Sequence, residues 1–343
     1  MKIVRSITQA SSSQEPAVIV LGNFDGFHKG HQVVVGEAGR IAREQGLPLA
    51  VFTTEPHPRS FFADQLGKEQ ESFRLTAFQA RSNLLEVFGV DILYVLDFDK
   101  DMAATSADDF VQSILLERLR AKHIVVGYDY QFGKGRVGDV TLLQNLSKKL
   151  GFDLTIINPV TLDNKVDGGE IYSSSLVREA LKNGEVRQAA NILGHWWSII
   201  GTVIDGDKRG RELGFPTINV DFGDSIIPRH GVYAVRLTIE GKDKQFEGAA
   251  NIGRRPTFGQ GSELLEVYIF DFDEEIYGLE VAVEIVAFIR DEARFESVEE
   301  LIKYIDDDCI VAKHILSDPA NDPNLLEAPS LENYLQKYPK PHG

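Results

Sequence analysis

The segment from residue 18 to residue 32 constrains the fold of this chain more than any other stretch. It begins with the apolar, β-branched run Val18–Leu21, passes through Gly22, and continues after His31 with apolar residues at helical spacing. A strand, a glycine-containing loop and a helix are therefore expected in that order. Such a loop points backbone N–H groups and the positive end of the helix dipole at one place, which suits a phosphate chain.

Two histidines, His28 and His31, lie near the start of this expected helix and would share one of its faces. Their imidazoles can donate hydrogen bonds to phosphate oxygens and stabilise charge that grows on a phosphorus atom under attack. Gly30 lets the backbone approach a ligand closely. The same spacing also suits a metal site or two surface residues, and for the pair alone these alternatives stay open. The preceding G-N-F-D-G sequence favours the chemical interpretation.

Composition excludes several classes of protein. With 343 residues, 43% hydrophobic and 26% charged, the chain resembles a globular protein of about two domains. Its 36 basic and 52 acidic residues give a formal charge of -16, which disfavours a general nucleic-acid surface. The single cysteine, Cys309, permits no intramolecular disulfide, and no apolar run approaches the ~20 residues of a membrane helix. We expect a cytoplasmic protein without nucleic-acid or membrane partners; the sequence leaves its oligomeric state undetermined.

Strands and helices alternate in the first half of the chain. Strands are expected at Val18–Leu21, Leu49–Thr54, Asp91–Leu96 and His123–Val126, and helices at Phe78–Phe88 and Ala107–Leu119. This alternation predicts a doubly wound parallel sheet, whose ligands bind at the carboxyl ends of the strands. Three of the loops at those ends carry unusual residues, including His57 between two prolines and Asp129 in a glycine-rich segment.

Three serines, Ser173, Ser174 and Ser175, open a further expected helix. Hydroxyl groups at this position are good N-caps, which is a purely structural explanation. They also suit a triphosphate bound at the helix N-terminus, with Arg178 one turn further on. For this segment alone, capping is the favoured explanation.

The second half of the chain has a different pattern, with short β-rich runs separated by glycine turns. The runs are Ile199–Ile204, Val232–Ile239, Gln245–Ala250, Leu265–Phe270 and Val281–Ile289. They predict a small antiparallel barrel. We therefore expect a first domain over residues 1–184 and a second over 185–317, which ends in a helix at Phe295–Leu316. Residues 318–343 are rich in proline, asparagine and charge and are expected to form a loosely packed tail.

Polar residues in the second domain suggest a phosphate and metal site. The loop that contains Gly210 and Arg211 suits a flap over ATP, although a surface hairpin would look similar. Thr217 and Asn219 would face the same side of an extended segment, where an oxygen from each suits Mg²⁺, unless both simply satisfy backbone groups. Glu266 begins an apolar strand, where its carboxylate would accept a hydroxyl proton beside metal-bound ATP. A solvent-facing glutamate is the commoner case.

Taken together, these motifs resemble a known enzyme family. G-N-F-D-G-F-H-K-G-H is similar to the H-x-G-H signature of the nucleotidylyltransferases, in the form found in bacterial bifunctional riboflavin kinase/FAD synthetases. The later P-H-P, G-x-D-x-x-F-G-x-G and S-S-S-L-V-R segments follow in the family's order. G-F-P-T-x-N, N-I-G-x-R-P-T-F-G and E-V-x-I-F-D-F resemble riboflavin kinase and cover most of the second domain.

The resemblance implies an α/β nucleotidylyltransferase domain with a Rossmann-like parallel sheet, followed by a small antiparallel β-barrel riboflavin kinase domain. It implies a bifunctional enzyme that phosphorylates riboflavin to FMN and then adenylylates FMN to FAD and pyrophosphate. ATP would be the substrate of both steps, with Mg²⁺ as the cofactor.

The resemblance also implies roles for individual residues. The catalytic residues would be His28, His31 and Glu266. ATP or its phosphates would be bound by Gly22, Asn23, Phe24, Gly30, Ser174, Ser175, Arg178, Gly210 and Arg211. The flavin would be bound by His57, Asp129, Asn251 and Arg254, and the metal by Thr217 and Asn219.

Two departures from the family pattern motivate an alternative. Thr54 stands where the family usually has phenylalanine, and Ile171 where a basic residue is often found. The alternative is a riboflavin kinase with a weakened adenylyltransferase site. A second alternative is a non-catalytic flavin-binding protein. A class I aminoacyl-tRNA synthetase shares the H-x-G-H loop, but the sequence has no K-M-S-K-S-like segment and its charge is unfavourable for tRNA.

Overall fold

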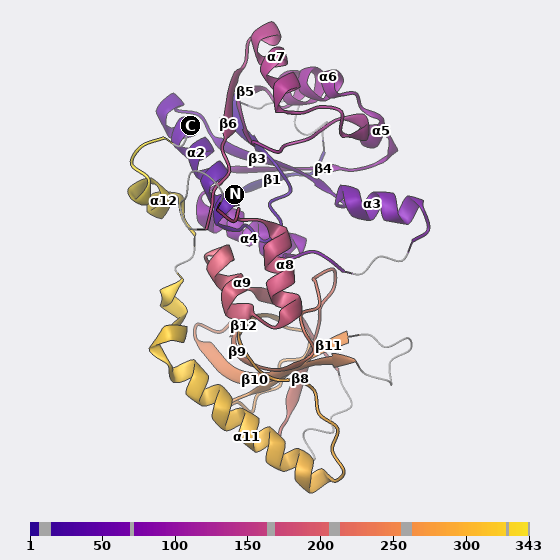
Figure 1. The fold of residues 1–343 in the computed structure, drawn as a ribbon, viewed down its shortest axis with the longest axis vertical. Coiled ribbons are helices and arrows are strands. Elements are labelled where there is room, and N and C mark those ends of the chain that lie inside the picture. Colours follow the sequence, from indigo (N-terminus) through magenta and orange to yellow (C-terminus); the bar gives the residue numbers. More distant parts are fainter. Residues whose placement is uncertain are drawn as a thin grey trace. The chain divides into compact units, whose positions relative to one another are not determined.

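The computed structural model describes residues 1–6, 15–68, 72–162, 169–205, 213–254, 263–326 and 329–341 (Figure 1). The chain forms two compact units. The first unit contains Met1–Gln70, Ser82–Tyr172 and Ala328–Gly343, and the second contains Glu71–Arg81 and Ser173–Glu327. Across these described ranges, no helix has the length and apolar character needed to cross a membrane.

The first unit is built on a six-stranded sheet with the order β1-β4-β3-β2-β5-β6. Its strands are β1 Lys2–Val4, β2 Ala17–Leu21, β3 Leu49–Glu55, β4 Ile92–Asp97, β5 Ala121–Gly127 and β6 Asp153–Ile157. Every strand pair is parallel, which confirms the predicted sheet. The short edge strand β1 was not expected, because three residues are too few to show a periodic pattern.

Helices connect these strands. They are α2 Lys29–Gln45, α3 Pro58–Gln65, α4 Phe78–Phe88, α5 Lys100–Ala104, α6 Ala107–Asp109, the π-helix η1 Phe110–Arg118, the 3₁₀ turn η2 Lys134–Arg136 and α7 Val140–Leu150. The structure agrees with the expected helix at Phe78–Phe88. It differs at Ala107–Leu119, where a short α-helix continues as a π-helix rather than as one regular helix.

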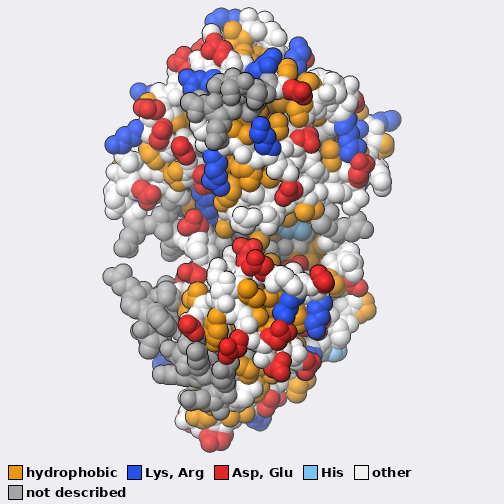
Figure 2. Space-filling view, turned by 180° about the vertical axis from the view of Figure 1, so that it is seen from behind, with side chains coloured by type: hydrophobic (Ala, Val, Ile, Leu, Met, Phe, Trp, Pro, Cys, Tyr) orange, Lys and Arg blue, Asp and Glu red, His pale blue; other side chains and the backbone are white. Residues whose placement is uncertain are grey.

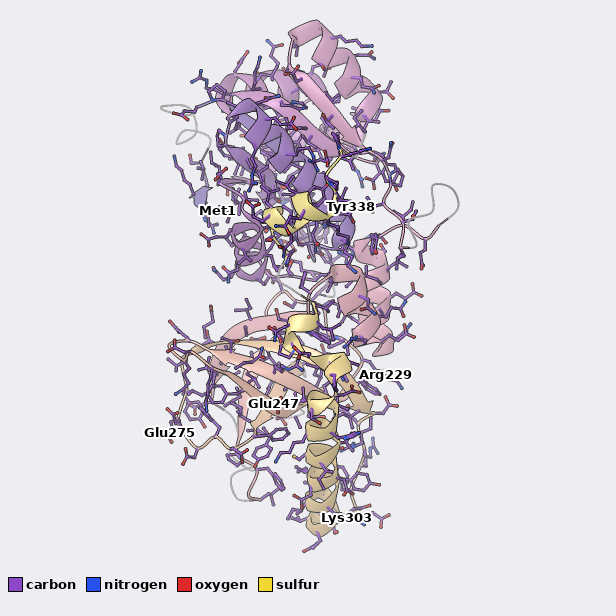
Figure 3. The ribbon with its side chains drawn as sticks, turned by 90° about the vertical axis from the view of Figure 1, so that its left-hand side faces the viewer. Met1, Arg229, Glu247, Glu275, Lys303 and Tyr338 are labelled. Carbon is purple, nitrogen blue, oxygen red and sulfur yellow. The ribbon has the colours of Figure 1, made fainter. Side chains whose placement is uncertain are left out.

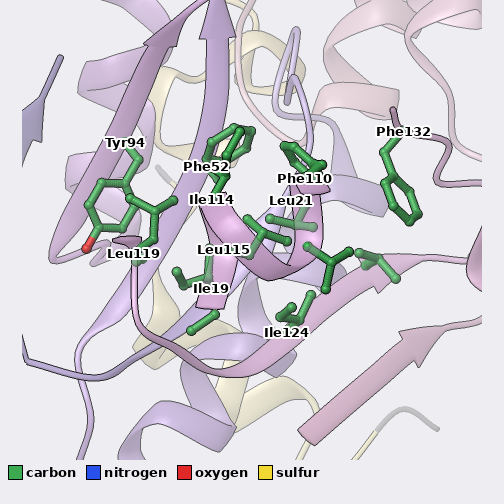
Figure 4. Packing of buried hydrophobic residues seen from close by; sticks show 14 of the residues in the cluster. Ile19, Leu21, Phe52, Tyr94, Phe110, Ile114, Leu115, Leu119, Ile124 and Phe132 are labelled. Carbon is green, nitrogen blue, oxygen red and sulfur yellow. The ribbon is translucent and has the colours of Figure 1, made fainter. Parts of the chain in front are cut away.

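A hydrophobic core lies between this sheet and η1 (Figure 4). Strand β2 is buried over its whole length, as expected for a parallel strand covered on both faces. The Phe52 ring from β3 meets the Phe110 ring of η1 edge-on, with centroids 5.5 Å apart. Each large side chain buried in this way stabilises the fold by roughly 1.5–3 kcal/mol. The core therefore holds rigid the strand ends from which the candidate site loops leave the sheet.

The second unit is a closed barrel with the strand order β10-β11-β8-β7-β12-β9. Its strands are β7 Ser198–Ile204, β8 Thr217–Asp221, β9 Gly231–Ile239, β10 Gln245–Arg254, β11 Glu263–Ile269 and β12 Glu280–Arg290. All neighbouring strands are antiparallel, which confirms the predicted barrel. The helices of this unit are α8 Ser174–Asn183, α9 Val186–Leu193 and α11 Val298–Ser317, followed by the 3₁₀ turns η3 Pro319–Asn321 and η4 Pro323–Leu325.

Helices α8 and α9 belong to the same compact unit as the barrel. The backbone N–H of Arg229, just before β9, donates to the carbonyl of Leu181 in α8 at 3.0 Å. The compact units therefore divide between Tyr172 and Ser173, whereas the predicted domain boundary lies after residue 184. Figure 2 shows acidic and basic side chains intermingled on the surface of both units.

The expectation of a loosely packed tail is wrong for the end of the chain. Residues Leu331–Lys337 form helix α12, in which Leu331 and Tyr334 are buried. The side chain of Ser330 caps this helix by accepting a hydrogen bond from the N–H of Asn333 at 3.2 Å. Leu331 and Tyr334 are three residues apart and so share one face of the helix, although the surrounding composition is polar.

Candidate active sites

The order in which strands are added to the sheet of the first unit reverses at β2. The chain runs from β2 to β3 and then β4 on one side, and returns to place β5 on the other side of β2. Ligands of such sheets bind in the crevice outside the carboxyl ends of the strands at this switch point. The loop that carries the two histidines follows β2, and the loop that carries Asp129 follows β5. The topology thus brings together two loops that are about a hundred residues apart in the sequence.

The loop after β2 has an unusual backbone. Phe24 and Phe27 both adopt positive φ angles, of 50° and 44°, although neither is glycine. Such conformations cost on the order of 1–3 kcal/mol each and persist where the surroundings over-determine them. Both rings are buried. A Cβ at Gly22 would lie 2.8 Å from the Phe24 ring, so only glycine fits beneath it.

The two histidines meet at the start of α2. His28 is the N-cap, and its Nδ1 accepts a hydrogen bond from the backbone N–H of His31 at 3.3 Å. The two rings stack with centroids 3.6 Å apart and planes 20° from parallel. Because Nδ1 of His28 accepts, Nε2 carries the proton in the neutral ring and is a hydrogen-bond donor. The arrangement presents imidazole and helix-dipole charge to one location, as a phosphate site requires.

His57 is linked to this loop. The side-chain amide nitrogen of Asn23 lies 3.1 Å from Nε2 of His57. His57 also caps α3, because its Nδ1 accepts a hydrogen bond from the N–H of Arg59 at 3.1 Å. A cap at the ring's other nitrogen holds the imidazole plane in a fixed orientation. The loops after β2 and β3 therefore form one connected wall.

A pocket of about 600 Å³ opens at this wall. The structure brings four predicted site residues to it, namely Gly22, Asn23, His57 and Asp129. Its volume falls within the usual range for small-molecule and cofactor sites, roughly 300–1,000 Å³. Predicted residues Phe24, Gly30, His28 and His31 lie in the adjoining loop and first turn of α2.

Sequence reasoning missed several residues that line this pocket. They include Thr53, Phe62, Phe98, Phe110 and Arg136. Phe61 and Phe62 stand shortly after the P-H-P segment, and both rings meet Phe98 edge-on at 5.3 and 5.8 Å. Their nearness to that segment was the only signal available. Thr53 had no sequence signal, yet its hydroxyl is buried and has no hydrogen-bond partner among the described residues.

The serine segment lies in the second compact unit, at the start of α8. Ser173 is the N-cap, and its hydroxyl accepts a hydrogen bond from the N–H of Leu176 at 3.3 Å. Ser174 and Ser175 are the first two residues of the helix. Nε of Arg178 donates to the carbonyl of Phe73 at 2.7 Å. Capping thus explains the first serine, and the ATP roles of Ser174, Ser175 and Arg178 stay predictions.

The barrel aligns three other predicted residues in a row. Glu266 on β11 is directly opposite Asn219 on β8 and directly opposite Asn251 on β10. Directly opposed residues on neighbouring strands place their side chains on the same face of the sheet. Thr217, two residues before Asn219, faces the same side and is opposite Tyr268. The structure therefore brings together the predicted base, the predicted metal ligands and one predicted flavin ligand.

The Asn219 side chain fits a metal ligand. Asn219 is 3% exposed, and its Oδ1 has no hydrogen-bond partner in the part of the chain that the structure describes. A buried carbonyl oxygen without a partner is costly unless a ligand satisfies it. Amide and hydroxyl oxygens suit Mg²⁺, which typically keeps few protein ligands beside phosphates and water. Among the described residues there is no cluster of three or more His, Cys, Asp or Glu that could hold a metal ion.

Thr217 also borders a pocket of about 240 Å³. Its other walls include Pro216, Ile269 and the acidic segment Asp273–Glu275. Predicted residues Gly210 and Arg211 lie outside the described residues. Arg254 is the last residue of β10, opposite Glu263, and its side chain lies outside what the structure describes.

Glu292 and His230 are polar groups near this row that sequence reasoning did not identify. Nδ1 of His230 lies 3.8 Å from Glu292 Oε2, and its Nε2 lies 3.3 Å from Glu263 Oε1. A Cβ at Gly253 would lie 2.0 Å from Glu292 Oε1 and 3.4 Å from the Asn251 amide nitrogen. Gly253 therefore leaves the space that the Glu292 carboxylate occupies near Asn251. These contacts join distant segments, so no local pattern predicts them.

A loop with two histidines at the switch point of a parallel sheet is typical of a nucleotidylyltransferase domain. The barrel, with its row of Asn219, Glu266 and Asn251, is typical of a kinase domain. Family models agree with this division. A model described as FAD synthetase matches residues 10–172, and one described as riboflavin kinase matches residues 193–316.

Whole-chain comparisons identify the family. The bifunctional riboflavin kinase/FMN adenylyltransferase of Escherichia coli strain K12 is 37% identical over 323 residues, which cover 93% of this chain and 100% of that protein. That of Bacillus subtilis strain 168 is 39% identical over 301 residues, covering 86% and 91%. A crystal structure named as a macrolide-efflux protein from Streptococcus pneumoniae superposes with a TM-score of 0.78 at 30% identity, covering 91% of this chain and 99% of that one.

The chain therefore belongs to the family of bifunctional riboflavin kinase/FMN adenylyltransferases. It is an enzyme of FAD biosynthesis with both transferase activities, as its motifs predicted.

Proposed function

We propose that the two reactions take place at the two sites described above. The barrel row of Asn219, Glu266 and Asn251 would phosphorylate riboflavin, and the histidine loop of the first unit would adenylylate FMN. The observation that carries this assignment is the strand register that sets Glu266 beside both Asn219 and Asn251. Glu266 thus lies on a single face of the sheet between the Asn251 amide and the buried Asn219 oxygen, which has no hydrogen-bond partner among the described residues.

In riboflavin phosphorylation, Glu266 accepts the proton of the terminal ribityl hydroxyl. The hydroxyl oxygen bonds to the γ-phosphorus of ATP, the bond from that phosphorus to the β-phosphate oxygen breaks, and ADP leaves. Thr217 and Asn219 would hold Mg²⁺, which supplies charge stabilisation between the phosphates when it is bound. Asn251 and Arg254 would bind the flavin, and Gly210 and Arg211 would cover ATP. Positioning supplies much of the rate of such a transfer.

Adenylyl transfer needs no side-chain nucleophile. A phosphate oxygen of FMN attacks the α-phosphorus of ATP, the bond to the β-phosphate oxygen breaks, and pyrophosphate leaves. His28 and His31 would donate hydrogen bonds to the oxygens on which charge grows, together with the N-terminal dipole of α2. The flavin would occupy the pocket lined by Asn23, His57 and Asp129. Phe24, Ser174, Ser175 and Arg178 remain proposed ATP ligands.

Single substitutions test this two-site assignment. His28→Ala or His31→Ala should lower the rate of FAD formation about 100- to 1,000-fold, because each removes a donor that stabilises the transition state. Neither should change FMN formation from riboflavin. Glu266→Ala should lower FMN formation about 100- to 10,000-fold and leave FAD formation from supplied FMN intact. Flavins are separated by chromatography over time with ATP and Mg²⁺ present.

The outcome that contradicts the assignment is loss of both activities from either kind of change. Wild-type protein that makes FMN but never converts added FMN would support the kinase-only alternative. Flavin binding without any turnover of ATP would support the binding-protein alternative. The cytoplasmic location and the absence of nucleic-acid partners stay predictions from the sequence.

A further inference from the structure

Helix α12 lies outside both family matches yet belongs to the adenylyltransferase unit. The riboflavin kinase match ends at residue 316, and α12 spans Leu331–Lys337. Residues Ala328–Gly343 nevertheless belong to the first compact unit, where α12 contacts α2. Figures 1 and 3 show this yellow helix beside the indigo helices of that unit, and Figure 3 labels Tyr338, which directly follows it.

Two glycines of α2 form the surface on which α12 docks. A Cβ at Gly36 would lie 2.4–2.5 Å from three atoms of the Tyr334 ring, and a Cβ at Gly39 would lie 2.5 Å from Cδ1 of Leu331. Glycine inside a helix costs about 1 kcal/mol relative to alanine. Two glycines three residues apart within a 17-residue helix are therefore accounted for by close approach of the second helix.

Polar contacts extend the docking surface along α2. The hydroxyl of Tyr334 donates to Glu37 Oε1 at 2.7 Å, and Glu37 is only 2% exposed. Arg40 bonds to Glu37 through its Nε at 3.3 Å and also donates to the carbonyl of Tyr338. Burying a carboxylate is costly unless hydrogen bonds compensate it. Glu37 is thus satisfied by one partner from α12 and one from its own helix.

The contacts show that α12 runs antiparallel to α2, toward the histidines. Leu331 meets Gly39, and Tyr334 meets Gly36. Burial lowers the pKa of the Lys29 ammonium group, and the nearby positive charge of Lys337 lowers it further. Lys29 is the first residue of α2 and follows the N-cap His28. The opposite side of α2 contacts β2, β3 and β5. Helix α2 is therefore held between the sheet and α12.

We propose that α12 is a clasp that positions α2, and through it the His28 and His31 rings, for adenylyl transfer. Leu331 and Tyr334 are then positioning residues of a reaction whose substrates they do not touch. This inference rests on the proposed roles of His28 and His31. A shift of about 1 Å at a catalytic group can cost on the order of 100-fold in rate, so a clasp of this kind affects turnover.

The test uses full-length variants and the two activities of the same molecule. Tyr334→Ala should lower kcat for FAD formation on the order of 10- to 100-fold, with KM for ATP and FMN changed less than about threefold. Tyr334→Phe keeps the ring on Gly36 and loses only the bond to Glu37, so it should restore most of kcat. Gln336→Ala, on the exposed side of α12, is the matched control and should match wild type. Riboflavin phosphorylation should stay within twofold of wild type in every variant.

A double substitution separates positioning from general loss of stability. Gly36→Ala should lower kcat for FAD formation in the wild-type background, because its methyl group meets the Tyr334 ring. In the Tyr334→Ala background the same change should have no further effect on kcat. Equal losses from Gly36→Ala in both backgrounds, or wild-type kcat in Tyr334→Ala, would overturn the clasp. If His28→Ala also kept full activity, the proposed histidine roles would fail instead, so the two failures are distinguishable.

Discussion

Asn219→Leu should make the barrel unit more stable while it removes the kinase activity. Asn219 is 3% exposed on β8, and its Oδ1 lacks a hydrogen-bond partner among the described residues. A buried polar atom left in this state costs about 1–3 kcal/mol. Leucine has a similar shape and removes that cost. We expect a net gain of about 1 kcal/mol in the free energy of unfolding without nucleotide.

Mg²⁺ and ADP should reverse this order of stability. A ligand at 100 times its Kd stabilises the folded protein by about 2.7 kcal/mol. Wild type should gain this amount from Mg²⁺ with ADP, whereas the variant should gain little, because it lacks the proposed ligand oxygen. The variant is then more stable than wild type without ligand and less stable with it. Riboflavin phosphorylation should fall at least 100-fold, and FAD formation from supplied FMN should not change.

Denaturant unfolding followed by tryptophan fluorescence measures the free energy of unfolding of the barrel unit, in which Asn219 lies. The chain has 2 tryptophans, Trp196 and Trp197, and both lie in the barrel unit. Thr217→Val is the matched control, because it removes the other proposed ligand oxygen from a side chain that is only half-buried. It should lose the ligand-induced gain without becoming more stable. A variant at Asn219 that is destabilised by more than about 1 kcal/mol without ligand, or that keeps the full gain with Mg²⁺ and ADP, refutes the reasoning.

Two further predictions concern the flavin pocket and the single cysteine. Thr54→Phe adds an aromatic ring to the wall of the 600 Å³ pocket. Stacking of this ring on the flavin should lower KM for FMN in adenylyl transfer about 2- to 10-fold, measured by steady-state kinetics. A raised KM would mean that the ring blocks the pocket. Burial, with Asp308 and Asp306, raises the pKa of the Cys309 thiol to about 11. Since only the thiolate reacts, alkylation at pH 8 should be on the order of 100-fold slower than for a free thiol and should keep rising up to about pH 11. A rate that levels off near pH 9 would contradict this.

Much of the fold was predictable because its patterns are local. The β-branched runs at Val18–Leu21 and Leu49–Thr54 became β2 and β3 within one residue, and the alternation with helices identified the parallel sheet. The short runs after residue 199 identified the barrel in the same way. Boundaries that depend on packing were not predictable. The π-helix η1 had no signal in the local sequence, and the compact-unit boundary at Tyr172 follows from contacts between distant segments.

The same distinction between local patterns and long-range contacts applies to the candidate sites. Roles for the motif residues His28, Thr217, Asn219 and Glu266 were predicted from the chain alone, because each stands in a short sequence with a chemical meaning. Their alignment was not, because the register that sets Glu266 opposite Asn219 and Asn251 arises only when three strands pair. The pocket walls at Thr53 and Phe98 and the Glu292 carboxylate had no motif and emerged only from the assembled structure.

The end of the chain shows this difference most clearly. By itself the sequence determined the enzyme family and the order of its two folds, and it predicted a set of phosphate-binding residues, because those depend on periodicity and on spacing over a few residues. Only the tertiary structure decided that residues 331–337 lie on α2, the helix that begins at the two predicted catalytic histidines. That contact requires Gly36 to lie against Tyr334 and Gly39 against Leu331, where a larger residue than glycine would not fit. The paired residues are nearly three hundred positions apart in the sequence. Packing complementarity over such a separation leaves no pattern along the chain, since it exists only between surfaces that folding has brought together.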